Sequence, residues 1–116
     1  MKKMTVNEFI EKNHIALFVK GDPKKNRFHI TKTALPLESN VLFEQLILYN
    51  TAKNLWKYLK KQTLLPRNWR HGNTRCILCR CDDKKVFYAL FYNSEQDFEE
   101  DYCFAKRLDK ELKEII

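Results

Sequence analysis

Two pairs of short apolar runs, each pair joined by a turn signal, constrain the fold more than any other feature of this chain. The first pair is IALFVK and RFHITKT, joined by GDPKKN, and the second is TRCILCRC and VFYALFY, joined by DDKK. Alternating β-branched and aromatic residues, bounded by Asp, Asn, Gly or Pro, are typical of antiparallel hairpins. The sequence therefore predicts one hairpin over residues 15–33 and a second over residues 74–92.

Capping residues before three other segments predict helices. Thr5 and Glu8 form a capping-box pattern at the start of a short helix that ends near Asn13. Ser39 is a favourable N-cap for a long central helix over 39–62. Ser94 with Asp97 caps a final helix over 94–115, in which bases follow acids as the helix dipole prefers. The apolar stripe expected on this helix consists of Phe98, Tyr102, Ala105, Leu112 and Ile116.

These elements predict the fold class. At 116 residues the chain has the length of one domain, residues 1–116, and its two glycines and three prolines indicate an element-rich chain. The order α-ββ-α-ββ-α is typical of an α+β fold. We expect two antiparallel hairpins, in one sheet, packed on the long central helix and flanked by the terminal helices.

The two halves of the predicted central helix differ in character. The first half, VLFEQLILY, is apolar on nearly every side, which favours complete burial. In the second half Ala52, Leu55, Trp56 and Leu59 form one apolar stripe. A ridge of like charges lies on the opposite face, at the spacing of helical neighbours, and consists of Lys53, Lys57, Lys60 and Lys61.

Basic residues are concentrated in one part of the sequence. From Gln45 to Cys81 there are eight Lys and Arg and no Asp or Glu. The net charge of the chain is +7, but residues 94–116 carry eight acids and four bases, so the first 93 residues carry +11. A domain this basic commonly binds phosphate backbones or an acidic protein surface.

The ridge continues into a predicted basic loop, residues 63–73, which contains RNWRHGN. Arginine binds phosphate through two donors, and a tryptophan can stack on an unpaired base. The candidate contact residues for nucleic acid or another partner are Lys53, Lys57, Lys60, Lys61, Arg67, Trp69, Arg70, His71 and Arg75. Our leading hypothesis is a small non-enzymatic accessory protein that binds DNA or RNA through the phosphate backbone.

Other functions fit the same residues. The chain could be an interaction or inhibitor protein, of the type found in viruses and mobile elements, that binds an acidic or nucleic-acid-handling protein, including as a subunit of a larger complex. A small ribonuclease could use Arg70 and His71 with a tyrosine. No glycine-rich phosphate loop, nucleophile elbow or HExxH pattern is present. The lysine ridge could also be only a solvated face.

The cysteines raise the question of a zinc site. Cys76, Cys79 and Cys81 lie close together in CILCRC, with His71 upstream. In an extended strand Cys76 points to the opposite face from the other two cysteines, so the pattern disfavours a tetrahedral site. We expect buried thiols that act as small apolar groups, with no metal and no cofactor.

The sequence also bears on location. No apolar run has the length needed to cross a bilayer, and Asn7, Glu8 and Glu11 interrupt the segment where a signal peptide would be apolar. Four cysteines favour a reducing compartment. We therefore expect a cytoplasmic protein that has no membrane partner.

Overall fold

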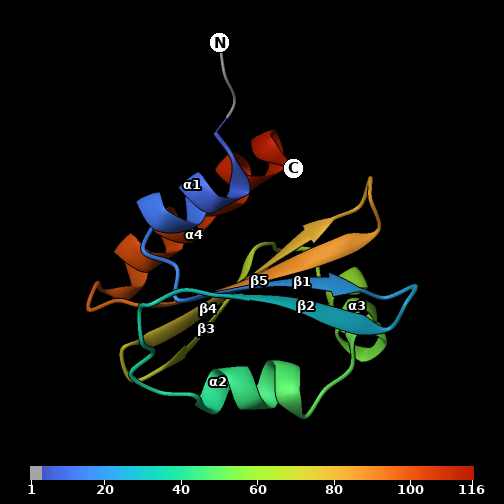
Figure 1. Ribbon diagram of the computed structural model, residues 1–116, viewed down its shortest axis with the longest axis horizontal. Helices are drawn as coiled ribbons and strands as arrows, with labels where there is room; N and C mark the ends of the chain where they lie inside the picture. The colour runs from blue at the N-terminus through green and yellow to red at the C-terminus, as the bar shows by residue number, and fades with distance from the viewer. Residues whose placement is uncertain (1–3) are drawn as a thin grey trace.

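The computed structural model describes residues 4–116 and shows one five-stranded antiparallel sheet with helices on both faces (Figure 1). The elements follow in chain order: α1 (Val6–Lys12), β1 (Leu17–Asp22), β2 (Arg27–Lys32), α2 (Val41–Phe43), the π-helical turn η1 (Glu44–Leu48), α3 (Ala52–Lys60), β3 (Arg67–His71), β4 (Thr74–Cys81), β5 (Val86–Asn93) and α4 (Phe98–Ile115). The α+β class is confirmed.

The two predicted hairpins are present and lie side by side in one sheet. The strand order is β2-β1-β5-β4-β3, so the first strand of the first hairpin pairs with the last strand of the second. This pairing runs from Leu17↔Phe91 to Gly21↔Phe87. It is antiparallel, and it therefore places the turn between β1 and β2 at the same end of the sheet as the turn between β4 and β5.

The sheet has a hydrophobic core on each face. Helices α1 and α4 cover one face, where Phe9 and Leu108 pack on Ile77 and Leu90. The segment containing α2 and η1, together with α3, covers the other face, where Leu55 and Leu59 belong to a second buried cluster. Alternation along each strand supplies both cores, because successive side chains point to opposite faces.

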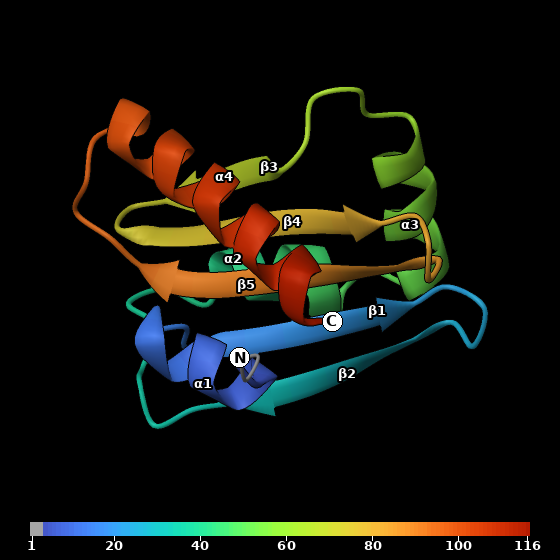
Figure 2. The same cartoon turned by 90° about the horizontal axis from the view of Figure 1, so that it is seen from above.

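The prediction of a single helix over 39–62 is wrong. The helical chain stops at Leu48, and α3 begins only at Ala52. Thr51 takes an extended conformation, and its side chain accepts a hydrogen bond from the Asn54 amide at 3.1 Å, so it is the N-cap of a new helix. The break changes the direction of the chain: α3 runs across one end of the sheet (Figure 2).

Complete burial of VLFEQLILY is also not what the structure shows. Leu42 and Ile47 are buried, but Leu48 and Tyr49 are exposed at 58% and 80%. The five residues of η1 form a π-helical turn, which ends the helix where the chain leaves the sheet. Leu48 and Tyr49, where this turn ends, therefore lie in solvent and not in the core.

The predicted basic loop 63–73 contains a strand. Residues Arg67–His71 form β3, which pairs with β4 through a two-residue turn in which Gly72 has a φ of +60°. A glycine at positive φ in such a turn is a hairpin signal. The sheet therefore gains a fifth strand at one edge.

The buried face of the final helix, α4, is rotated about the helix axis relative to the apolar stripe expected from the sequence. Its predicted members Phe98 and Tyr102 are 71% and 43% exposed, whereas Asp101 is 2% exposed. Asp101, Ala105, Leu108 and Leu112 are the buried residues of α4. The face of α4 that packs on the sheet is the one that allows Asp101 to bind Arg75.

The sequence predicts N-caps for three helices, and the structure confirms the first of them. Thr5 accepts from the Glu8 amide at 3.1 Å, which confirms the predicted capping residue. On α4 the cap is Asp97, whereas Ser94 hydrogen-bonds Asp101. Ser39 precedes the N-cap of α2 and is not itself that cap.

Candidate nucleic-acid interface

Helix α3 is fixed across one end of the sheet by a hydrogen bond at each of its ends. Near its start, the Asn26 side chain, in the turn between β1 and β2, accepts from the Lys53 amide at 3.0 Å. At its end, the Arg80 guanidinium on β4 donates to the Leu59 carbonyl at 2.6 Å. A cation at this position also suits the negative end of the helix dipole. The helix therefore spans the sheet end from the first hairpin to the second (Figure 2).

The lysine ridge faces solvent. Ala52, Leu55 and Leu59 are buried against the sheet, and the four ridge lysines, Lys53, Lys57, Lys60 and Lys61, are all exposed. Within residues 4–116, none of these four lysines forms an ion pair. Like charges at helical spacing repel each other by a few tenths of a kcal/mol per pair, and no intramolecular carboxylate relieves that repulsion here.

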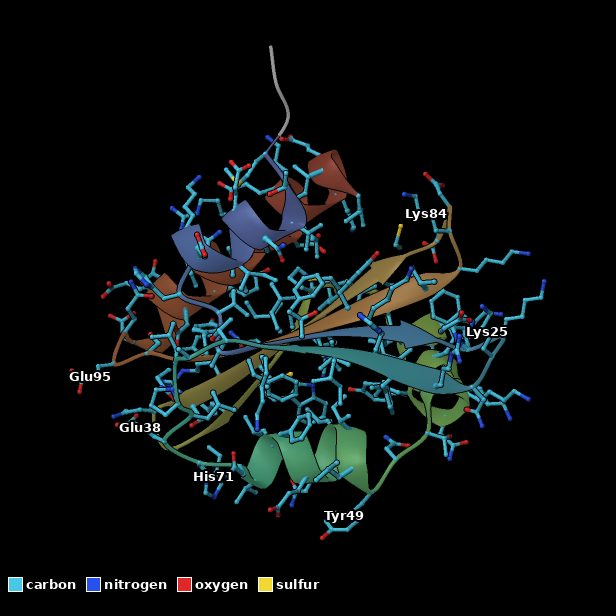
Figure 3. The ribbon with its side chains drawn as sticks, viewed as in Figure 1. Lys25, Glu38, Tyr49, His71, Lys84 and Glu95 are labelled. Atoms are coloured by element: carbon cyan, nitrogen blue, oxygen red, sulfur yellow. The ribbon has the colours of Figure 1, made fainter. Side chains whose placement is uncertain are left out.

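The two hairpin turns add cations that sequence reasoning missed. Figure 3 shows Lys25 and Lys84 at the same end of the molecule. We call this surface the basic end. Its cations are Lys20, Lys24, Lys25, Arg27, Lys53, Lys57, Lys60, Lys61, Lys84 and Lys85, and all ten are exposed.

Four of the five missed lysines lie in GDPKKN and DDKK, which sequence reasoning treats as turns only, and the fifth, Lys20, lies on β1. Those turns are 58 residues apart when measured from Lys25 to Asp83. Only the pairing of β1 with β5 brings them together. A lysine pair in each of two turns was the available signal, but local sequence does not specify the strand order that joins them.

The charge of the basic end is strongly unbalanced. Its acids are Asp22, Asp82 and Asp83, so ten cations and three anions give a net charge of +7. Asp82 is already paired with Arg80 at 3.0 Å. The centres of the two turns are two strand spacings apart, about 10 Å in a flat sheet. This separation is close to the Debye length of about 10 Å at 0.1 M salt, so salt does not fully screen one turn from the other. An approaching polyanion therefore meets these cations as one field.

The opposite end of the molecule is acidic. Glu38 and Glu95 lie there, far from Lys25 and Lys84 in Figure 3. The first turn of α4 adds Glu99 and Glu100. The carboxylates around Glu100 raise its pKa, with Asp97 as the main cause. The charge asymmetry between residues 1–93 and residues 94–116 thus becomes, in large part, an asymmetry between the two ends of the fold.

The structure separates the predicted contact residues into groups. Lys53, Lys57, Lys60 and Lys61 belong to the basic end. His71, on β3, lies toward the acidic end in Figure 3 and contacts Ser39 through Nδ1 at 3.0 Å.

Arg70 and Arg75 both meet the carboxylate of Asp101. Arg70 is exposed, and its guanidinium lies 3.8 Å from Asp101. Arg75 is 2% exposed, and its Nε lies 2.5 Å from the same carboxylate, so it belongs to the core and not to a surface site. The predicted contact set therefore loses Arg75 and is not one continuous surface.

Trp69 is not an exposed stacking platform in a loop. It lies on β3 opposite Cys76 and packs against the core cluster on the α3 face. Its ring centroid is 6.1 Å from that of Tyr58, and the Arg67 guanidinium carbon lies 6.0 Å from the indole. The side chain is partly buried, and its indole nitrogen has no solvent exposure. Trp69 supports the sheet beneath α3.

The cysteines point to opposite faces of β4, as the strand alternation predicts. Cys76 belongs to the core cluster under α3, and Cys79 belongs to the cluster under α4. Burial raises the pKa of both thiols, and nearby Asp109 raises that of Cys79 further. Over residues 4–116 no group of three or more His, Cys, Asp or Glu side chains is placed to bind a metal ion.

No helix in the described part of the chain combines the length and apolar character that a bilayer crossing needs. Comparison of the chain with models of protein families, with curated proteins and with solved structures finds no match. The geometry and charge of the basic end are therefore the features of this protein that bear on its function.

Proposed function

We propose that this protein binds nucleic acid through the phosphate backbone, using the basic end as the contact surface. The observation that carries the proposal is the convergence of ten exposed cations from α3, from two hairpin turns and from the adjoining ends of β1 and β2, none of them in an ion pair within residues 4–116. Such cations are free to replace the counterions that surround a phosphate backbone.

Lysine chemistry favours backbone contact over base reading. Nine of the ten cations are lysines, which bind phosphate as flexible point charges and lack the planar fork by which arginine recognises guanine. The partly buried indole of Trp69 is not free to stack on a base. The protein should therefore bind with weak sequence preference, as an accessory protein and not as a sequence-specific regulator. Four free cysteines fit a cytoplasmic setting.

An acidic protein could use the same surface, as a nucleic-acid-handling enzyme with an acidic patch would. The basic end does not distinguish these partners by charge alone, but they differ in what co-purifies with the protein. Bound nucleic acid absorbs at 260 nm and disappears on nuclease treatment, whereas a protein partner remains at a fixed ratio.

The experiment that tests the proposal is charge reversal on the ridge. The variant Lys53→Glu/Lys57→Glu should lose at least about tenfold in affinity for a labelled 20-nucleotide oligonucleotide, since it removes two phosphate contacts and places two carboxylates on the same surface. Both side chains are exposed and opposite the buried stripe, so the fold should be retained.

A matched control separates a local surface from net charge. The variant Lys106→Glu/Lys110→Glu has the same change of four charge units and the same helical spacing, on α4, away from the basic end. It should weaken binding far less than the ridge variant. Equal losses in both variants would show attraction to net charge without a site. Affinity that is unchanged in the ridge variant would exclude the basic end as the contact surface.

A further inference from the structure

Within residues 4–116, the outer edge of β3 offers unpaired backbone groups. The Ser94 amide donates to the Asn73 carbonyl at 2.7 Å, so the backbone groups of Asn73 point toward the segment that follows β5. Along β4, alternate residues must then hydrogen-bond to β5 and to β3. By alternation, Thr74, Cys76 and Leu78 turn their backbone groups toward β3. Their partners on β3 are His71, Trp69 and Arg67, whose backbone groups point back toward β4. The residues between them, Asn68 and Arg70, therefore direct their N–H and C=O groups away from the sheet.

A groove lies beside this edge, with a volume of about 350 Å³. It lies between the segment from Thr63 to Asn68 and the first turns of α4, where Phe98 and Tyr102 line it. Its large apolar side chains are unusually exposed: Leu64 by 76%, Phe98 by 71% and Tyr102 by 43%. Exposed apolar groups that gather around a hollow are typical of interaction sites.

The charges around the groove select the kind of partner. Arg67 and Lys106 line it, and among the described residues no carboxylate lines it. Arg70, further along β3, is exposed at the same edge. A second copy of this chain, paired edge to edge, would place these cations near their own equivalents, which is unfavourable. A strand that carries carboxylates would instead be attracted.

We propose that the β3 edge and the adjoining groove bind an extended, acidic segment of a partner protein, which adds a sixth strand to the sheet. Backbone groups of Asn68 and Arg70 pair with the segment, as in other cases of strand addition. Alternate apolar side chains of the segment enter the groove against Phe98, Tyr102 and Leu64. Its carboxylates meet Arg67, Arg70 and Lys106. This site is separate from the basic end and does not depend on the proposed nucleic-acid function.

The test begins with random twelve-residue peptides displayed on phage and selected on the intact protein. The proposal predicts enrichment of peptides in which apolar residues alternate with Asp or Glu. A synthetic copy of an enriched peptide should bind the wild type at least about tenfold more tightly than it binds Phe98→Ala or Tyr102→Ala, as expected for central apolar contacts. Both side chains are exposed, so these variants should fold.

Strand addition is tested separately from the groove. Asn68→Pro removes an outward N–H without breaking the ladder to β4, and should abolish binding. Ile30→Pro is the matched control, because Ile30 lies on the other edge strand, β2, and should leave binding unchanged. If Asn68→Pro fails to fold, N-methylation of the peptide gives the same test: methyl groups on one alternate set of peptide nitrogens should abolish binding, and on the other set should not.

Three outcomes would overturn the proposal. One is that no peptide is enriched. Another is that enriched peptides bind the groove and edge variants as well as they bind the wild type. The last is that the protein forms a concentration-dependent dimer that Asn68→Pro abolishes, which would assign the edge to a second copy of the chain.

Discussion

The guanidinium of Arg75 on β4 and the carboxylate of Asp101 on α4 form a buried ion pair, with Nε and Oδ2 2.5 Å apart and each residue 2% exposed. The pair is embedded in further hydrogen bonds. Arg75 also donates to the Gly72 carbonyl, and the Ser94 hydroxyl donates to Asp101 at 3.0 Å. A buried charge is tolerated only when its partners satisfy it. The pair therefore fixes the rotation of α4 on the sheet.

Removal of one partner from this pair should be costly. Asp101→Ala leaves the Arg75 guanidinium buried without its counterion, and we expect a loss of about 3–5 kcal/mol in the free energy of unfolding. Urea denaturation followed by circular dichroism measures it. Glu99→Ala, two residues earlier on an exposed position of α4, is the control and should change stability by less than about 0.5 kcal/mol. A loss below about 1 kcal/mol in Asp101→Ala would show that the pair does not position α4.

Gly21 is required by the close approach of Phe87. A β-carbon built on Gly21 would lie 2.1 Å from the Phe87 ring. Gly21→Ala should therefore lower the free energy of unfolding by about 1–3 kcal/mol through overpacking. The double variant Gly21→Ala/Phe87→Leu should lose less than the sum of the two single changes, because the smaller side chain leaves room. Additive losses would mean that the two positions do not compete for space.

The buried thiols predict a loss of stability in alkali. Burial raises the pKa of Cys76 and Cys79 well above the ordinary 9.0. The folded state therefore retains two protons that the unfolded chain releases as the pH rises through 9, so stability is fully present well below pH 9 and falls as the pH rises through and beyond it. Between pH 8.5 and 10 we expect a loss of about 2 kcal/mol, measured by urea denaturation.

The control for the alkaline loss is Cys103→Ser, since Cys103 is exposed and its replacement should leave the pH dependence unchanged. Cys76→Ala/Cys79→Ala should start from a lower stability but lose much less of it between these pH values. A wild-type stability that stays constant to pH 10 would contradict the burial of the two thiols.

Local patterns in the sequence predict the hairpins, the first capping residue and the buried stripe of α3. Each of these depends on residues close together in the chain. The rotation of α4 could not be predicted in this way, since it depends on a pairing between Arg75 and Asp101 across 26 residues. An apolar stripe through Phe98 and Tyr102 was the reasonable expectation, and the buried charge overrides it.

The candidate site shows the same limit. The ridge lysines can be found from helical spacing alone, because one face of one helix contains them. The lysines of the two hairpin turns join them only through the pairing of β1 with β5, a long-range contact. Trp69 was misassigned because RNWRHGN has the composition of a loop, although Gly72 at its end makes the tight turn of a hairpin.

The salt dependence of oligonucleotide binding tests the central claim most directly. If the basic end neutralises about four to six phosphates, a plot of log affinity against log salt should fall with a slope of about −3.6 to −5.4 on duplex DNA, and less steeply on single strands. The same slope should be shallower for Lys53→Glu/Lys57→Glu and nearly unchanged for Lys106→Glu/Lys110→Glu. Absence of binding even at low salt, or binding whose affinity does not change with salt, would contradict phosphate recognition by the basic end.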